Sequence, residues 1–534
     1  MKKRLLIIPL LFLLLNACKK GSGGPDVEPV STLRVNRSTL ILSGNAVALD
    51  SFHIQTDVDW KITLSASAVG WLGVDTDHGS GSGQVRLNAF SDNLGLQERN
   101  ATIEIVDVAG ALPTVTVKVT QTAFVIRPFS KTWGGVKSDF FTTMVVTGDG
   151  GYAMAGYSAS DDGDFAGNRG SMDLLVLRTD GEGNRIWQKT YGGSGFDAAA
   201  AMVNTADGGM LITGQTTSSD GDVQGLHGNN DFWLMKLDAS GNKVWSKTYG
   251  GKGYDGAAAI TATPDGGYIL AGYASSSDGD VTSHLNFELN FYDVWLVKVD
   301  ASGNKVWEHS YGGQGDDLAT SIHAAPGGGY YVGGYTQSNN GDFTGARGAD
   351  DAFLMKISED GTLNWSNRYG GARADATQSI DVDIDGNLVL SVTTYSIDGD
   401  GEGNHGGSDL LILKTDPSGN VLWKSIFGGS SNDFAQSAIS NPDGTMLLVG
   451  WGLSRDQDFA TGYGANDAWV IRLDGQGHAT WKKNFGGQLD DVAMTVVRDP
   501  RKGFVLAGDA SSKDQDISVN HGASDAWLLK FGTP

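Results

Sequence analysis

The segment Asp238-Ala-Ser-Gly-Asn-Lys-Val-Trp-Ser-Lys-Thr-Tyr-Gly-Gly-Lys-Gly-Tyr-Asp255 carries a pattern that runs through most of the chain. Its double glycine occurs seven times, at successive spacings of 58, 58, 62, 58, 58 and 58 residues. The seven copies are Gly134-Gly135, Gly192-Gly193, Gly250-Gly251, Gly312-Gly313, Gly370-Gly371, Gly428-Gly429 and Gly486-Gly487. An aspartate follows four residues after the second glycine each time. A fixed period of this length is typical of a repeat architecture.

Each repeat predicts four short strands. In one repeat these are the alternating runs 257–263, 268–273, 293–299 and 305–311, separated by turns rich in Asp and Gly. Tight turns between alternating runs favour antiparallel hairpins. Four antiparallel strands, repeated seven times, predict a seven-bladed β-propeller over residues 125–534.

The two ends of the repeat region predict how the propeller closes. The last repeat ends after its third strand, 525–530, whereas an additional strand, Pro128–Trp133, precedes the first repeat. This N-terminal strand is expected to complete the last blade, which would cover an otherwise unpaired edge. The pattern resembles repeat families of bacterial secreted and surface lipoproteins with the consensus D-x-W-L-x-K-L-D-x-x-G-N-x-x-W-x-K-T-Y-G-G. That resemblance implies a fold and no particular chemistry.

The N-terminus is typical of an export signal. A basic start, Lys2 to Arg4, precedes the apolar run Leu5 to Leu15, which is too short to span a bilayer. The run ends in Leu15-Asn16-Ala17-Cys18, which resembles the lipobox of bacterial lipoproteins. The resemblance implies a signal peptide over 1–17, a lipid on Cys18 and a flexible tether over 18–30. It further implies an anchor in the outer membrane, facing the periplasm or, as we favour, the cell surface.

Residues 31–124 predict a small β-sandwich of short alternating strands. Its landmarks are Asp59-Trp60, Gly70-Trp71-Leu72, a Gly/Ser run from Gly79, and Arg99 before a long strand. Together they resemble a BACON domain, which implies an association with carbohydrate. Trp60 and Trp71 fit two interpretations, sugar-stacking surfaces or core residues.

Acidic residues are expected to gather on one face of the propeller. In a four-stranded meander, the links between blades and the second-to-third loops lie on the same side. Both contain aspartates that recur at the same place in each repeat, such as Asp255 in a link and Asp280 in a loop. These carboxylates have three interpretations. They shape turns by accepting backbone N–H groups, they contact a ligand, or they bind calcium through sets such as Asp220, Asp222 and Asp231.

One second-to-third loop departs from the repeat. Its alternating apolar residues, including Phe287, Phe291 and Tyr292, replace small polar ones. They predict either an aromatic binding patch near the propeller axis or an added hairpin packed on its neighbour. Trp451 is a further aromatic candidate for ligand contact.

The sequence contains no recognisable catalytic motif or Cys/His cluster, so no cofactor is expected beyond the calcium alternative. A formal net charge of −23 disfavours nucleic acid and anionic lipid as partners. The leading hypothesis is a monomeric, non-catalytic envelope lipoprotein that binds glycan or glycoprotein. The alternatives are a scaffold for envelope protein assembly and a glycan-active hydrolase or lyase whose residues converge only in the fold.

Overall fold

The computed structural model describes residues 31–43, 48–91, 93, 97–122, 128–283, 291–501 and 503–532. The predicted signal peptide, Cys18 with its tether, and Phe287 lie outside the described residues. Contacts divide the chain into two compact units, Met1–Val125 and Ile126–Pro534. The described residues form strands and four one-turn 3-10 helices, η1 (Ala66–Ala68), η2 (Gly163–Phe165), η3 (Gly399–Gly401) and η4 (Gln457–Phe459). The prediction of an all-β chain is confirmed.

The first unit contains two sheets that share one apolar core. One sheet has the order β1 (Leu33–Val35), β3 (Leu49–Thr56), β7 (Gly83–Ala89) and β5 (Leu72–Val74). The other has the order β2 (Thr39–Leu42), β9 (Val115–Gln121), β8 (Arg99–Asp107), β4 (Asp59–Leu64) and β6 (His78–Ser80). Alternate residues of each long strand point into the core, as in β8 and β9.

The two tryptophans of the first unit belong to this core. Trp60 and Trp71 are each 4% exposed. The Trp60 indole N–H donates to the Gly81 carbonyl at 2.8 Å, and the Trp71 indole N–H donates to the Ser67 carbonyl at 2.6 Å. Both rings are therefore buried with their polar atoms satisfied, so the core interpretation is confirmed and the sugar-stacking interpretation is wrong.

The second unit, in its described part, consists of seven four-stranded antiparallel sheets. The first strands are β11 (Asp139–Val146), β15 (Asp197–Asn204), β19 (Asp255–Ala262), β23 (Asp317–Ala324), β27 (Asp375–Val382), β31 (Asp433–Ser440) and β35 (Asp491–Arg498). The second strands are β12 (Tyr152–Ser158), β16 (Met210–Thr216), β20 (Tyr268–Ala274), β24 (Tyr330–Thr336), β28 (Leu388–Thr394), β32 (Met446–Gly452) and β36 (Phe504–Ala510).

The third strands are almost fully buried, and the fourth strands are half-exposed. The third strands are β13 (Asp173–Thr179), β17 (Asp231–Leu237), β21 (Asp293–Val299), β25 (Asp351–Ile357), β29 (Asp409–Thr415), β33 (Asp467–Leu473) and β37 (Asp525–Phe531). The fourth strands are β14 (Arg185–Tyr191), β18 (Lys243–Tyr249), β22 (Lys305–Tyr311), β26 (Leu363–Tyr369), β30 (Val421–Phe427), β34 (Ala479–Phe485) and, in the last sheet, β10 (Phe129–Trp133).

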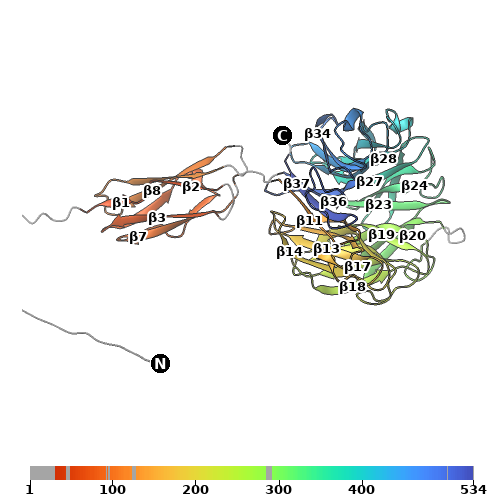
Figure 1. Ribbon diagram of the computed structural model, residues 1–534, viewed down its shortest axis with the longest axis horizontal. Helices are drawn as coiled ribbons and strands as arrows, with labels where there is room; N and C mark the ends of the chain where they lie inside the picture. The colour runs from red at the N-terminus through yellow and green to blue at the C-terminus, as the bar shows by residue number, and fades with distance from the viewer. Residues whose placement is uncertain are drawn as a thin grey trace, which may run out of the picture. The chain divides into compact units, whose positions relative to one another are not determined.

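The sheets follow one another around a ring, which makes this unit propeller-like (Figure 1). Each first strand contacts the first strand of the next sheet, and β35 of the last sheet contacts β11 of the first. At the same junction, β10 pairs antiparallel with β37, with Phe129 opposite Lys530. Every first strand also contains a one-residue bulge near its middle, for example between Phe141 and Thr143 of β11. The bulges lie where all seven first strands meet.

The junction between the last and first sheets contains a buried ionic cluster. The Asp499 carboxylate pairs with Lys530, whose side chain is 3% exposed, and accepts a hydrogen bond from the Tyr152 hydroxyl at 2.5 Å. Arg501, beside this cluster, forms an ion pair with Glu182 of the first sheet at 2.9 Å. In other sheets the corresponding ion pair lies within the sheet, and its turn carboxylate is exposed in pairs such as Lys236 with Asp207, at 63%, but buried in Lys414 with Asp383, at 8%. The cluster therefore ties the last sheet to the first through side chains, in addition to the covalent link 134–138 that connects β10 to β11.

Candidate functional site

Aspartates at the start of the first strands organise the links between sheets. Asp255 has no exposed surface. Its Oδ2 accepts the Gly251 N–H at 2.8 Å and the Ser276 hydroxyl at 2.6 Å, and its Oδ1 accepts the Ser276 N–H at 3.2 Å. The N–H of the second link glycine donates to the corresponding aspartate in all seven links. Asp255 therefore holds the link in place, and its burial leaves no surface for the predicted ligand contact.

The aspartates that begin the third strands lie beside this first group. Asp231 accepts the backbone N–H of His227 at 2.8 Å through Oδ2, which also contacts the His227 ring at 2.7 Å. A Cβ on Gly250 would lie 2.8 Å from Oδ1 of Asp231 and 2.8 Å from Oδ2 of Asp255. Only glycine fits between the two carboxylates. Burial raises the pKa of Asp231, and the nearby Asp255 raises it further.

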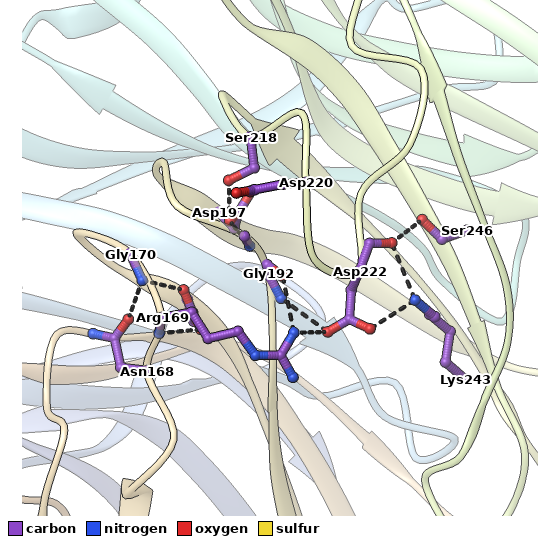
Figure 2. A network of polar contacts seen from close by, with 12 residues as sticks. Asn168, Arg169, Gly170, Gly192, Asp197, Ser218, Asp220, Asp222, Lys243 and Ser246 are labelled. Carbon is purple, nitrogen blue, oxygen red and sulfur yellow. Dashed lines mark hydrogen bonds and ion pairs between the residues drawn. The ribbon is translucent and has the colours of Figure 1, made fainter.

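Asp222 joins two neighbouring sheets at the same level (Figure 2). It accepts the Gly192 N–H at 3.3 Å, pairs with Arg169 of the preceding sheet at 2.8 Å and pairs with Lys243 of its own sheet at 2.6 Å. Asp220, on the same loop, accepts the Ser194 N–H at 2.7 Å. Asp280, the counterpart of Asp222 in the next sheet, accepts the Gly250 N–H at 3.4 Å and pairs with Lys305 at 2.7 Å. These contacts fit the turn-shaping interpretation.

The same contacts weaken the calcium alternative. Asp220 and Asp222 accept N–H groups or pair with cationic side chains of the protein, and Oδ2 of Asp231 accepts the His227 N–H, whereas its buried Oδ1 has no hydrogen-bond partner. Within the described ranges, no group of three or more His, Cys, Asp or Glu residues could hold a metal ion.

The remaining repeated residues pack neighbouring sheets together. The Tyr249 hydroxyl donates to the Gly303 carbonyl of the next sheet at 2.5 Å. The Trp245 ring lies against Gly303, since a Cβ there would come within 2.8 Å of that ring. Burial raises the pKa of the Tyr249 hydroxyl well above its usual range. The consensus of the repeat is thus explained by contacts that hold sheets together.

A pocket of about 620 Å³, here called the axial pocket, lies where the first strands meet. Its lining includes residues of all seven first strands, among them the bulge residues Thr142, Ala200, Ala258, Thr320, Gln378, Gln436 and Met494. Other lining residues come from the ends of second strands and from the links, which places the mouth on the side of the links, here called the link face. None of the described residues that line it is charged.

The wall of the axial pocket differs from one side to the other. Alanines of β15 and β19 and the rings of Tyr157, Phe196 and Tyr273 form an apolar side, whereas Gln378, Gln436 and several hydroxyl groups form a polar side. The ring centroids of Tyr157 and Phe196 lie 6.1 Å apart. A pocket with an apolar wall and a few convergent polar groups is suited to a small uncharged ligand.

A second pocket of about 570 Å³, here called the rim pocket, lies on the third sheet. It is lined by Asn229, Lys252, Gly253, Tyr254, Ser275, Ser276, Ser277, Asp278 and Tyr292. Tyr292 meets Tyr273 of the axial pocket edge to face, with ring centroids 5.0 Å apart and an interplanar angle of 77°.

The predicted aromatic candidates have different positions. Tyr292 lines the rim pocket, and the half-buried Phe291 precedes it. Phe287 is outside the described residues, so the predicted aromatic patch stays a prediction. Trp451 stacks on Phe434 at 4.1 Å and is not among the residues that line the axial pocket.

Asp509 lies at the second-strand position that is Tyr157 in the first sheet and Trp451 in the sixth. It is 8% exposed, and its carboxylate accepts a hydrogen bond from the Ser524 hydroxyl at 2.8 Å. Burial, and then Asp491 and Asp490, raise the pKa of Asp509 to about 7. The sequence prediction missed Asp509 and the axial pocket. Comparing the seven repeats position by position would have marked these positions as variable, although only the fold shows that the first strands converge on a pocket.

Comparisons with known proteins provide little further information. No family model matches the chain. The Regulatory protein FlaEY of Caulobacter vibrioides is 24% identical over 234 residues, which are 39% of this chain and 23% of that relative. The chain thus spans about a quarter of the curated relative it matches.

Solved structures share only a coarse likeness. Sqt1 from Chaetomium thermophilum covers 77% of this chain and 100% of its own, at 13% identity and a TM-score of 0.41. A Synechocystis apocarotenoid oxygenase mutant covers 82% of this chain and 96% of its own, at 12% identity and a TM-score of 0.35. A Bacteroides ovatus GH5 xyloglucanase in complex with a XXXG heptasaccharide covers 23% of this chain and 30% of its own, at 19% identity and a TM-score of 0.16. At these TM-scores the likenesses support no functional conclusion. In the part of the chain that is described, no helix could cross a membrane.

Proposed function

We propose that this protein binds a glycan, without catalysis, in the axial pocket at the link face. The observation that carries the proposal is the axial pocket, which has no charged lining residue among those described although the chain is strongly acidic. One of its sides is apolar and the other is polar. A pyranose ring has an apolar face that stacks on aromatic rings, and hydroxyl groups that need hydrogen-bonding partners at its edge. Tyr157 and Tyr273 provide rings, and Gln378 and Gln436 provide amides that both donate and accept.

The variation around the pocket supports a binding role. Its central ring of bulge residues includes Ala200 and Ala258 on one side and Gln378 and Gln436 on the other. Each is compatible with the same strand geometry, since all seven first strands have the same length and bulge. The fold therefore does not require these differences, and a ligand with unlike sides explains them.

We also propose the finer architecture and the location. The second unit is a closed seven-bladed β-propeller, supported by the contact of β35 with β11 and the pairing of β10 with β37. The first unit is a BACON-like domain, supported by its sequence landmarks and its two-sheet core. A lipid on Cys18 would anchor the protein in the outer membrane with the second unit free to reach glycans, which the Ala17-Cys18 sequence supports.

A glycan array tests the proposed function. The chain expressed without residues 1–18 is applied to neutral and acidic glycans, beside the variants Tyr273→Ala and Gln436→Ala. We expect binding to neutral glycans that both variants lower by about tenfold, the effect of losing roughly 1.4 kcal/mol. Absence of binding to every glycan would contradict the proposal and favour an envelope scaffold. Hydrolysis of a bound glycan would contradict the non-catalytic part.

A further inference from the structure

We infer that the ligand is a neutral oligosaccharide that occupies the axial pocket and the rim pocket together, across the wall formed by Tyr273 and Tyr292. This inference rests on the proposed function and adds to it the length and the charge of the ligand.

The axial pocket and the rim pocket adjoin each other at one pair of aromatic rings. Tyr273 lines the axial pocket and Tyr292 lines the rim pocket. Their edge-to-face contact at 5.0 Å leaves no third residue between the two rings. The Tyr273 hydroxyl also contacts the Gln215 amide oxygen at 3.4 Å, and the amide of Asn230 donates to the same oxygen at 3.1 Å. These hydrogen bonds fix the orientation of the ring that both pockets share.

The rim pocket has the groups that a second sugar needs. Tyr254 is 52% exposed and presents its ring to solvent at the pocket wall. Asn229, Ser275 and Ser277 add amide and hydroxyl groups around it. An exposed tyrosine surrounded by such groups can stack on one sugar face while its neighbours bind the hydroxyl groups.

The third sheet alone has tyrosine at all three positions that build this surface. The position of Tyr254 is occupied elsewhere by Ser138, Phe196, Asp316, Ala374, Asn432 and Asp490. The position of Tyr292 is occupied by Met172, Asn230, Asp350, Ser408, Asn466 and Ser524. The position of Tyr273 is occupied by Tyr157, Gln215, Tyr335, Thr393, Trp451 and Asp509. Since six sheets form without this combination, the fold does not explain it.

The charges around the rim pocket favour a neutral ligand. Lys252 is its one basic lining residue among those described, and it pairs with Asp278 at 2.9 Å. Asp316 is a carboxylate, so it offers an acidic sugar no favourable charge. Its negative charge also helps to raise the pKa of the Tyr292 hydroxyl, after the larger effect of burial. An acidic sugar would therefore meet a negative field without a free cation to offset it.

The test compares a disaccharide with a hexasaccharide of the neutral series that binds in the array. Calorimetry is performed on the parent chain and on Tyr254→Ala, Tyr254→Phe and Tyr273→Ala. Tyr463→Ala is the matched control, because Tyr463 is a 46% exposed tyrosine of the sixth sheet. Thermal unfolding confirms that each variant is folded.

We expect the hexasaccharide to bind at least tenfold more tightly than the disaccharide. Tyr254→Ala should remove that advantage and leave disaccharide binding unchanged, Tyr254→Phe should retain it, and Tyr273→Ala should weaken both ligands. Equal affinity for both lengths, or an equal effect of Tyr254→Ala on both, would overturn the two-pocket inference while the proposed function stands. Failure of every series to bind would overturn both.

Discussion

The link network and the axial mouth are neighbours in the second unit, yet they follow opposite rules. In the links, the same aspartate accepts the same glycine N–H in all seven copies. At the mouth, equivalent positions range from Ala258 to Gln378 and from Tyr273 to Gln215. Residues that hold one sheet to the next must satisfy the same geometry at each junction. Residues facing the axis have no such requirement, so they can serve a ligand.

The buried ionic cluster of the last sheet sharpens this comparison, because it departs from the repeat while its groups pair with one another. Asp499→Ala should lower the free energy of unfolding by about 3–5 kcal/mol, since it leaves the buried Lys530 without its partner. Asp207→Ala, in the corresponding ion pair of the second sheet, where the carboxylate is 63% exposed, should cost less than about 1 kcal/mol. Urea denaturation measures both. Similar losses would mean that the buried ionic cluster has no special role.

The stability of the protein should decrease as pH rises from about 4 to about 7 and then level off. Burial raises the pKa of the link carboxyls Asp317 and Asp491 and of the third-strand carboxyl Asp409 to about 6, and that of Asp509 to about 7. Groups with a raised folded-state pKa contribute most stability below their unfolded pKa, and that contribution is lost as pH passes the folded value. With about 1.4 kcal/mol per pKa unit, the loss should reach a few kcal/mol.

Asp509→Asn separates the contribution of Asp509 from that of the other three carboxyls in this pH profile. Urea midpoints measured between about pH 4 and 8 should decrease less steeply in this variant, because one titrating group is lost, and the decrease between about pH 6 and 7 should disappear. The decrease below about pH 6, to which Asp317, Asp409 and Asp491 contribute, should remain. A profile that is flat in the parent chain would contradict the raised pKa values of these carboxyls.

Substitutions in the two regions should differ in their effect on stability. Asp255→Ala should lower the free energy of unfolding by about 1–3 kcal/mol, because buried donors of Gly251 and Ser276 lose their acceptor. Gln378→Ala should change it by less than about 0.5 kcal/mol, because the equivalent residue is already Ala258 in another sheet. Calorimetric unfolding of the two variants gives the comparison, and a larger loss in Gln378→Ala would reverse it.

The smallest effect is expected from metal removal. The link carboxylates accept N–H groups, and the loop carboxylates Asp222 and Asp280 pair with Lys243 and Lys305, so EDTA should leave the thermal midpoint unchanged. A concentration-dependent rise on adding calcium would instead restore the calcium alternative.

The repeat pattern was sufficient to predict an all-β fold of repeated four-stranded units, because spacing and turn residues recur. It could not identify the axial pocket. Gln436 and Thr142 are ordinary strand residues in sequence, and they become pocket residues only because seven first strands converge. Asp255 stood out for the opposite reason. Its repetition drew attention, and repetition turned out to reflect its structural contacts in the links.

The most direct test measures glycan affinity and thermal stability together in two tyrosine variants of the third and second sheets. Tyr273→Ala removes a ring from the axial mouth, and Tyr249→Phe removes the hydroxyl that bonds the Gly303 carbonyl at 2.5 Å. We predict that Tyr273→Ala lowers affinity about tenfold with an unchanged thermal midpoint. Tyr249→Phe should lower stability by about 1 kcal/mol with unchanged affinity. If Tyr249→Phe lost binding, or Tyr273→Ala bound as tightly as the parent chain, the division between repeated structure and variable binding surface would be contradicted.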